Sequence, residues 1–139
     1  MTIRQSLALF LIAGLAACQA PGKPSDALSL NSSGDPTDTI VVVAQAAQKC
    51  WFKSKDKTFT PYRLANEVNA PAGRPRFLLV PRRDPGGLPL LVVQAENKGD
   101  TATGKFTHIQ TFGPLLSTPA GQRITNDIKR WSSGNTACA

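Results

Sequence analysis

Several residue types that build active sites are nearly absent from this 139-residue sequence. It contains one histidine, one tyrosine and one methionine, and three cysteines. Catalytic triads and zinc centres need several such side chains, so most of these constellations lack their parts. Acidic residues are also few, nine against 16 basic ones, and no spacing pairs two of them for glycoside hydrolysis. We therefore expect neither an enzyme nor a cofactor.

Long apolar runs are also missing. Residues 7–15 (LALFLIAGL) form an apolar run behind the basic Arg4. This run is too short for a membrane-spanning helix, which needs about 20 residues. A basic start followed by a short apolar run is typical of an export signal.

A cysteine lies directly behind this run. The motif Leu15-Ala16-Ala17-Cys18 resembles the lipobox of bacterial lipoproteins, in which an aliphatic residue and two small residues precede the modified cysteine. The resemblance covers residues 1–18 and implies that residues 1–17 are removed and that Cys18 becomes an acylated N-terminus. Several acyl chains give a lasting membrane anchor. The alternative is an ordinary secretory signal followed by an unrelated cysteine.

The residue after the cysteine bears on localisation. Gln19 stands where the sorting rule of enteric bacteria places Asp in proteins kept at the inner membrane. The resemblance therefore implies a protein anchored to the outer membrane on its periplasmic face. The inner membrane and the cell surface are the alternatives.

The mature chain divides into a tether and one domain. Residues 19–36 (QAPGKPSDALSLNSSGDP) are dominated by Pro, Gly, Ser, Asn and Asp, and they contain too little apolar surface to fold alone. The sequence thus predicts a signal peptide over 1–17, a lipidated N-terminus and flexible tether over 18–36, and a single domain over 37–139.

Apolar periodicity predicts the fold class of that domain. Residues 38–51 carry apolar side chains at helical spacing, with Thr37 or Asp38 as the cap. A second helix is expected with Ser117 or Thr118 as its cap and with Ile124, Ile128 and Trp131 on one face. Strands are expected at residues 62–68, 76–80, 88–95 and 105–112, with polar turns between the last three. The prediction is an α+β two-layer sandwich of order α-β-β-β-β-α, in which an N-terminal and a C-terminal helix flank a four-stranded antiparallel sheet.

Two cysteines remain once Cys18 carries lipid. Cys50 and Cys138 have one intramolecular pairing, and the periplasm is oxidising, so a disulfide is predicted. A redox pair is the alternative, but such cysteines usually lie close in sequence. A metal site would add His108 and would still have three protein ligands at most.

Two further motifs are weak. Residues 99–105 match the phosphate-loop spacing G-x-x-x-x-G-K, but Phe106 follows where Ser or Thr is needed, and a strand follows where a helix is needed. We interpret the segment as a hairpin loop and His108 as an ordinary strand residue.

One basic cluster is the candidate binding site. Arg74, Arg76, Arg82 and Arg83 bracket an apolar strand, and with Arg63 they could surround one hairpin. Guanidinium groups bind carboxylates and phosphates in a bidentate manner. The alternative is a solvated edge that prevents strand aggregation. Lys53 and Lys55 lie in a separate stretch of the sequence and are expected to contribute less to binding.

These observations predict a non-catalytic envelope lipoprotein. Its domain would bind an anionic or protein partner in the periplasm, namely an envelope protein, peptidoglycan or anionic lipid, and a nucleic acid is not expected. Membrane contact would come from the lipid anchor. The alternative is an inhibitor of a lysozyme or protease that inserts the loop at 82–87 or at 99–104 into the enzyme's cleft.

Overall fold

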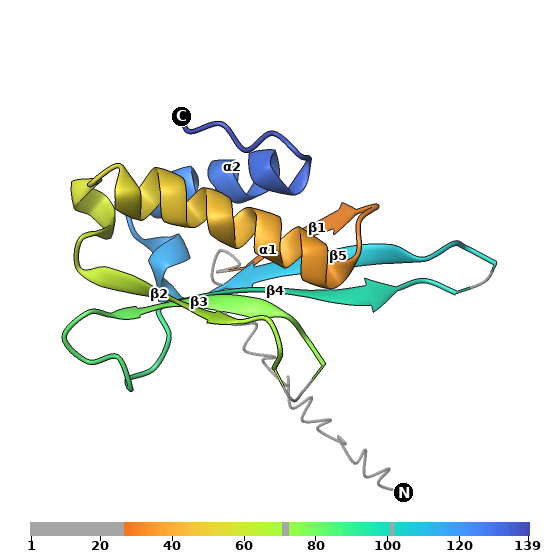
Figure 1. Cartoon of the computed structure of the whole chain (residues 1–139), viewed down its shortest axis with the longest axis horizontal. Helices are drawn as coiled ribbons and strands as arrows, with labels where there is room; N and C mark the ends of the chain where they lie inside the picture. The colour runs from red at the N-terminus through yellow and green to blue at the C-terminus, as the bar shows by residue number, and fades with distance from the viewer. Residues whose placement is uncertain (1–26, 71–72, 101) are drawn as a thin grey trace, which may run out of the picture.

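The computed structural model describes residues 27–70, 73–100 and 102–139 (Figure 1). One antiparallel sheet has the strand order β1-β5-β4-β3-β2, and helices α1 and α2 lie together on one of its faces. The strands are β1 (Ala27–Ser32), β2 (Tyr62–Glu67), β3 (Arg76–Pro81), β4 (Leu91–Lys98) and β5 (Phe106–Phe112). The helices are α1 (Pro36–Ala47), the π-helical η1 (Gln48–Lys53), the 3-10 turns η2 (Lys57–Phe59) and η3 (Pro114–Ser117), and α2 (Gly121–Ser132). The predicted α+β class is confirmed.

The sheet has five strands where the sequence analysis expected four. The additional strand β1 comes from the segment predicted to be tether, and it pairs with β5 so that Leu30 lies opposite Ile109. Leu28 and Leu30 alternate with polar residues and pack against the core. This segment cannot fold alone, but the unpaired edge of β5 offers it hydrogen-bonding groups. The folded domain therefore starts by Ala27, and the predicted boundary at residue 37 is wrong.

The start of α1 also differs from the prediction. Asp35, and not Thr37 or Asp38, is the N-cap, and its carboxylate accepts hydrogen bonds from the backbone N–H groups of Thr37 (2.8 Å) and Asp38 (3.4 Å). Pro36 occupies the first helical position, where a missing N–H costs nothing.

The core lies between the sheet and the two helices. Alternate strand residues such as Leu79, Val93 and Ile109 point into it, together with Ile40 from α1 and Ile128 from α2, and all five are fully buried. The opposite face of the sheet carries no helix (Figure 1). Within the described ranges, no helix is long and apolar enough to cross a membrane.

Candidate functional site

The four candidate arginines do not form one group. Arg74 and Arg76 lie where β3 begins, whereas Arg82 and Arg83 follow its last residue. Six residue steps of extended chain separate Arg76 from Arg82, which is about 20 Å. The two pairs therefore lie at opposite ends of the sheet, and one compact ligand cannot contact both.

Arg74 and Arg76 have acidic partners. The Nε of Arg76 lies 2.6 Å from the Oε2 of Glu67, and the Nε of Arg74 lies 3.2 Å from the Oε2 of Glu96. Lys98 also binds Glu96, with its Nζ 3.1 Å from the Oε1. The hydrogen bond from Lys98 and the charge of Arg74 hold the pKa of Glu96 below its ordinary value. We name these five residues the paired end, and their charges are largely balanced within the protein.

Arg82 and Arg83 form no ion pair with any carboxylate of the described part of the chain. The backbone N–H of Arg82 donates to the Pro61 carbonyl at 2.8 Å, and its Nε donates to the Thr60 carbonyl at 3.0 Å. These two bonds hold the backbone and the Nε of Arg82 against the segment before β2. Arg83 is exposed beside it. Both arginines can therefore bind an external anion.

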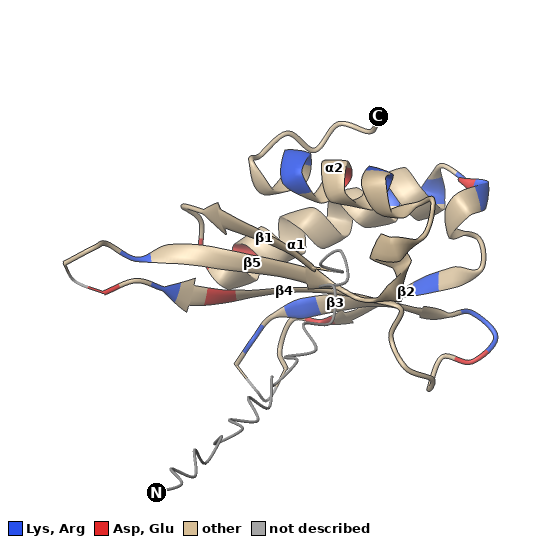
Figure 2. Ribbon diagram, turned by 180° about the vertical axis from the view of Figure 1, so that it is seen from behind, with Lys and Arg blue, Asp and Glu red and all other residues tan. Residues whose placement is uncertain are grey.

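Three further basic residues lie near this pair. Arg63 lies opposite Val80 in the β2–β3 pairing, and Lys55 lines the same shallow cleft as Arg82. Figure 2 shows that the basic segments of β2, of the β3–β4 loop and of the turn before β2 lie at one end of the molecule. We name this group of exposed residues the cationic end; it consists of Lys55, Lys57, Arg63, Arg82 and Arg83.

Lys53 and Lys55 were expected to lie apart from the arginines, and the structure corrects this for Lys55. Lys53 lines a different cleft, with Asn66 and Val68. Lys55 is about 27 residues from Arg82 along the chain, but the backbone contact between Arg82 and Pro61 brings the two segments together. Sequence spacing contains no signal for such a contact. The only hint was the density of lysine in residues 53–57.

An exposed apolar residue lies in the same loop. The β3–β4 loop turns at Asp84, whose carbonyl accepts a hydrogen bond from the Gly87 N–H at 3.1 Å, as the predicted tight turn requires. The next residue, Leu88, is 86% exposed. Sequence reasoning assigned Leu88 to a strand and missed it, because β4 begins only at Leu91.

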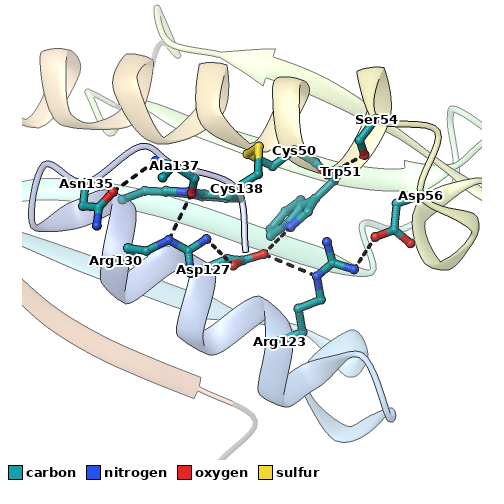
Figure 3. The surroundings of a disulfide bond; sticks show 11 residues. Cys50, Trp51, Ser54, Asp56, Arg123, Asp127, Arg130, Asn135, Ala137 and Cys138 are labelled. Carbon is teal, nitrogen blue, oxygen red and sulfur yellow. Dashed lines mark hydrogen bonds and ion pairs between the residues drawn. A yellow bond between two sulfur atoms is a disulfide. The ribbon is translucent and has the colours of Figure 1, made fainter.

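A disulfide braces the cationic end (Figure 3). Cys50 and Cys138 are bonded, with 5.2 Å between their Cα atoms, which confirms the predicted pairing. The next residue, Trp51, stacks on Phe59 at 4.5 Å and packs against Trp131 at 5.0 Å between ring centroids. The two tryptophans therefore lie side by side next to the disulfide.

A buried carboxylate continues this brace. Asp127 on α2 is 1% exposed and accepts hydrogen bonds from the Trp51 Nε1 at 2.8 Å and from Arg130 at 2.6 Å (Figure 3). Arg123 lies on the next turn and joins Asp127 to Asp56, which is flanked by Lys55 and Lys57. The backbone N–H of Thr58 and the Arg123 guanidinium hold the pKa of Asp56 below its ordinary value. The turn that carries the lysines is thus fixed to α2.

The residues of the weaker motifs do not meet. His108 lies on the helix-free face, where its Nδ1 is 3.0 Å from the Oδ1 of Asn31, while both cysteines are bonded in the helical layer. The metal alternative, which needs His108 beside the two cysteines, therefore has no geometric basis. Residues 99–105 connect β4 and β5 as a hairpin loop, as interpreted from the sequence.

Comparisons with known proteins did not identify a family for this chain. A scan against family models, a search of curated proteins and a search of solved structures each found no match. Cys18 lies outside the described residues. The function has to be argued from the residues of this chain.

Proposed function

We propose that the protein is a non-catalytic envelope lipoprotein whose cationic end binds an anionic partner in the periplasm. Lipid on Cys18 would hold it at the periplasmic face of the outer membrane. The observation that carries the proposal is the contrast in pairing: Arg74 and Arg76 have carboxylate partners, whereas Arg82 and Arg83 have none in the described ranges.

The physical support comes from charge and rigidity. Five exposed basic residues lie together, Asp56 forms an ion pair with Arg123, and Asp84 is the other acidic residue in this region. An anion that binds here replaces water around charges that the fold leaves unpaired. The disulfide and Asp127 hold the supporting segments in place, so little conformational entropy is lost on binding.

Charge reversal tests the binding site. Arg82→Glu with Arg83→Glu should weaken capture of the partner from envelope extracts by roughly 10- to 30-fold, since a basic residue near an anionic surface contributes about 1 kcal/mol. Capture by the unaltered protein should also weaken as salt rises. The matched control is Lys105→Glu with Lys129→Glu, which makes the same net charge change at two exposed sites elsewhere. Equal losses in both variants would contradict a local site.

The anchor has its own test. Cys18→Ser should leave the protein uncleaved or unattached to the membrane, because no thiol remains to receive the lipid. Fractionation and mass spectrometry of the N-terminal peptide measure this. Normal cleavage and membrane partition of Cys18→Ser would contradict lipidation and leave an ordinary secretory signal.

One observation also favours the alternative of hydrolase inhibition. The β3–β4 loop presents Leu88 at 86% exposure beside a tight turn, and such a loop can enter an enzyme cleft. An inhibitor should block a lysozyme or protease at stoichiometric concentration, and Leu88→Ala should relieve the block. Absence of inhibition across a panel of periplasmic hydrolases would remove this alternative.

A further inference from the structure

We infer that the cationic end rests on the anionic phospholipid surface of the same membrane that holds the anchor, with Leu88 among the headgroups. The inference rests on the proposed lipidation of Cys18 and names the partner of the proposed site. Three independent features carry it: the point where the chain enters the sheet, the chemistry of the cationic end, and the small apolar area there.

The chain enters the sheet near the cationic end. Ala27 lies opposite Phe112, and Phe112 lies opposite Val92, so Ala27 is two strand spacings, about 10 Å, from the start of β4. The Leu115 N–H donates to the Leu90 carbonyl at 3.1 Å, which holds the β3–β4 loop to the end of β5. The entry point and the Arg82–Arg83 loop therefore share one end of the sheet.

The length of chain between Cys18 and Ala27 keeps the entry point of the sheet close to the lipid. Nine residue steps reach at most about 30 Å when fully extended. The β4–β5 loop is farther from Ala27 by the length of β5, which is about 20 Å. The cationic end is therefore the nearer of the two ends to a lipid on Cys18, and its charges and exposed apolar side chains favour it for contact with the bilayer.

The two ends also differ in chemistry toward lipid. At the cationic end, arginines without carboxylate partners flank Leu88, and Phe112 is 38% exposed in the same strand row as Ala27. Basic side chains bind lipid phosphates, and an exposed leucine gains by entering the interface. At the opposite end, Arg74, Arg76 and Lys98 are already paired with Glu67 and Glu96, so this end has less free positive charge to bind headgroups.

The apolar area favours a membrane over a folded protein partner. In the described part of the chain, three large apolar side chains are exposed, namely Val42, Leu88 and Phe112, and two of them are at this end. A stable protein interface buries about 800 Å² per partner around an apolar centre, and two side chains are too few for that. A bilayer contact can be weak, because the anchor already holds the domain at high effective concentration.

The experiment reports the depth of each end. The lipidated protein is reconstituted into vesicles of phosphatidylethanolamine and phosphatidylglycerol with brominated acyl chains, which quench nearby tryptophan. Trp51 and Trp131 are buried and provide the baseline. Leu88→Trp places a reporter at the cationic end, and Ala102→Trp places the matched reporter in the exposed β4–β5 loop.

The inference expects strong extra quenching for L88W and none for A102W. Adding Arg82→Glu and Arg83→Glu should reduce the quenching of L88W to the A102W level, since each basic residue contributes about fivefold on an anionic surface. Lys105→Glu with Lys129→Glu should not. Vesicles of phosphatidylcholine alone should show little quenching at either reporter.

Several results would overturn the inference. Equal quenching of L88W and A102W would mean a randomly oriented domain, and an unquenched L88W in anchored protein would mean that the cationic end faces away. Both outcomes leave the lipoprotein proposal intact. Capture of a periplasmic protein that Arg82→Glu with Arg83→Glu abolishes, together with an unquenched L88W, would assign the site to that protein. If Cys18 carries no lipid, that result would instead contradict the proposed function.

Discussion

Both ends of β3 carry arginines, and they differ in what the neighbouring strands place beside them. At the start of β3, Glu67 on β2 and Glu96 on β4 lie within ion-pair distance of Arg76 and Arg74. At the end of β3, the Nε of Arg82 donates to the Thr60 carbonyl, and Lys55 lines the same cleft as Arg82. The comparison teaches that charge density along a sequence does not show whether a charge is free. That depends on the strand register, which decides which side chains face one another.

The largest expected effect concerns the brace of the cationic end. Cys50→Ala with Cys138→Ala opens a loop closed over 88 residues, and the chain-entropy relation gives about 4.6 kcal/mol as the upper limit of the lost stability. Urea denaturation followed by tryptophan fluorescence measures this, with reduced wild-type protein as the control. A loss below about 1 kcal/mol would show that the brace does not depend on the disulfide.

The next effect concerns Asp127, the part of the brace that does not include the disulfide. Asp127→Ala should lower the free energy of unfolding by about 3 kcal/mol, because it leaves the Trp51 N–H and two arginines without their buried acceptor. Asp127→Asn retains an oxygen acceptor and should cost less. If both variants lose the same stability, the negative charge and not the hydrogen bonding holds α2 to the lysine-bearing turn.

A third prediction defines the extent of the cationic end. Lys55→Glu with Lys57→Glu should weaken binding to the anionic partner roughly tenfold, close to the effect of reversing Arg82 and Arg83. This expectation reverses the ranking drawn from sequence for Lys55, because Lys55 and Arg82 line one cleft. Surface-immobilised partner or vesicle binding measures it. Binding as strong as in the Lys105→Glu and Lys129→Glu control would restrict the site to the β3–β4 loop.

A fourth prediction concerns the paired end. Arg74→Gln with Arg76→Gln should leave binding unchanged and lower the free energy of unfolding by about 1 kcal/mol or less, since both ion pairs are partly exposed to solvent. Thermal unfolding and the same binding measurement report the two quantities. A loss of binding similar to that of Arg82→Glu with Arg83→Glu would make the two ends equivalent and remove the comparison.

The smallest effect is an acid response. The pKa of Asp56 is lowered by the Thr58 N–H and Arg123, so the unfolded chain takes up its proton first as the pH falls. Stability from this carboxylate is fully present above its ordinary pKa of 3.8 and is lost as the pH falls through the lower folded value. Melting temperatures between pH 5 and pH 2 should fall less steeply for Asp56→Asn than for wild type. An unchanged slope would assign acid sensitivity to other carboxylates such as Glu96 and Asp100, whose pKa values are also lowered.

Local patterns determined much of the fold. Helical spacing in residues 38–51 predicted α1 and its continuation η1. Apolar patterns separated by turn residues predicted the strands β2 to β5 and the meander of β3 to β5. Counting cysteines predicted the bond between Cys50 and Cys138. These features depend on residues near one another in the chain or on a count, which a sequence contains directly.

Tertiary structure decided the remainder. β1 exists because the edge of β5 was available to residues that are too polar to fold alone. Of the four predicted arginines, strand register paired two and left two without carboxylate partners in the described ranges, while the Arg82–Pro61 contact brought lysines beside the latter. Pairing of charges and of strand edges is set by contacts between distant segments. The sequence alone thus determined where the basic residues are, and only the folded sheet decided which of them are free.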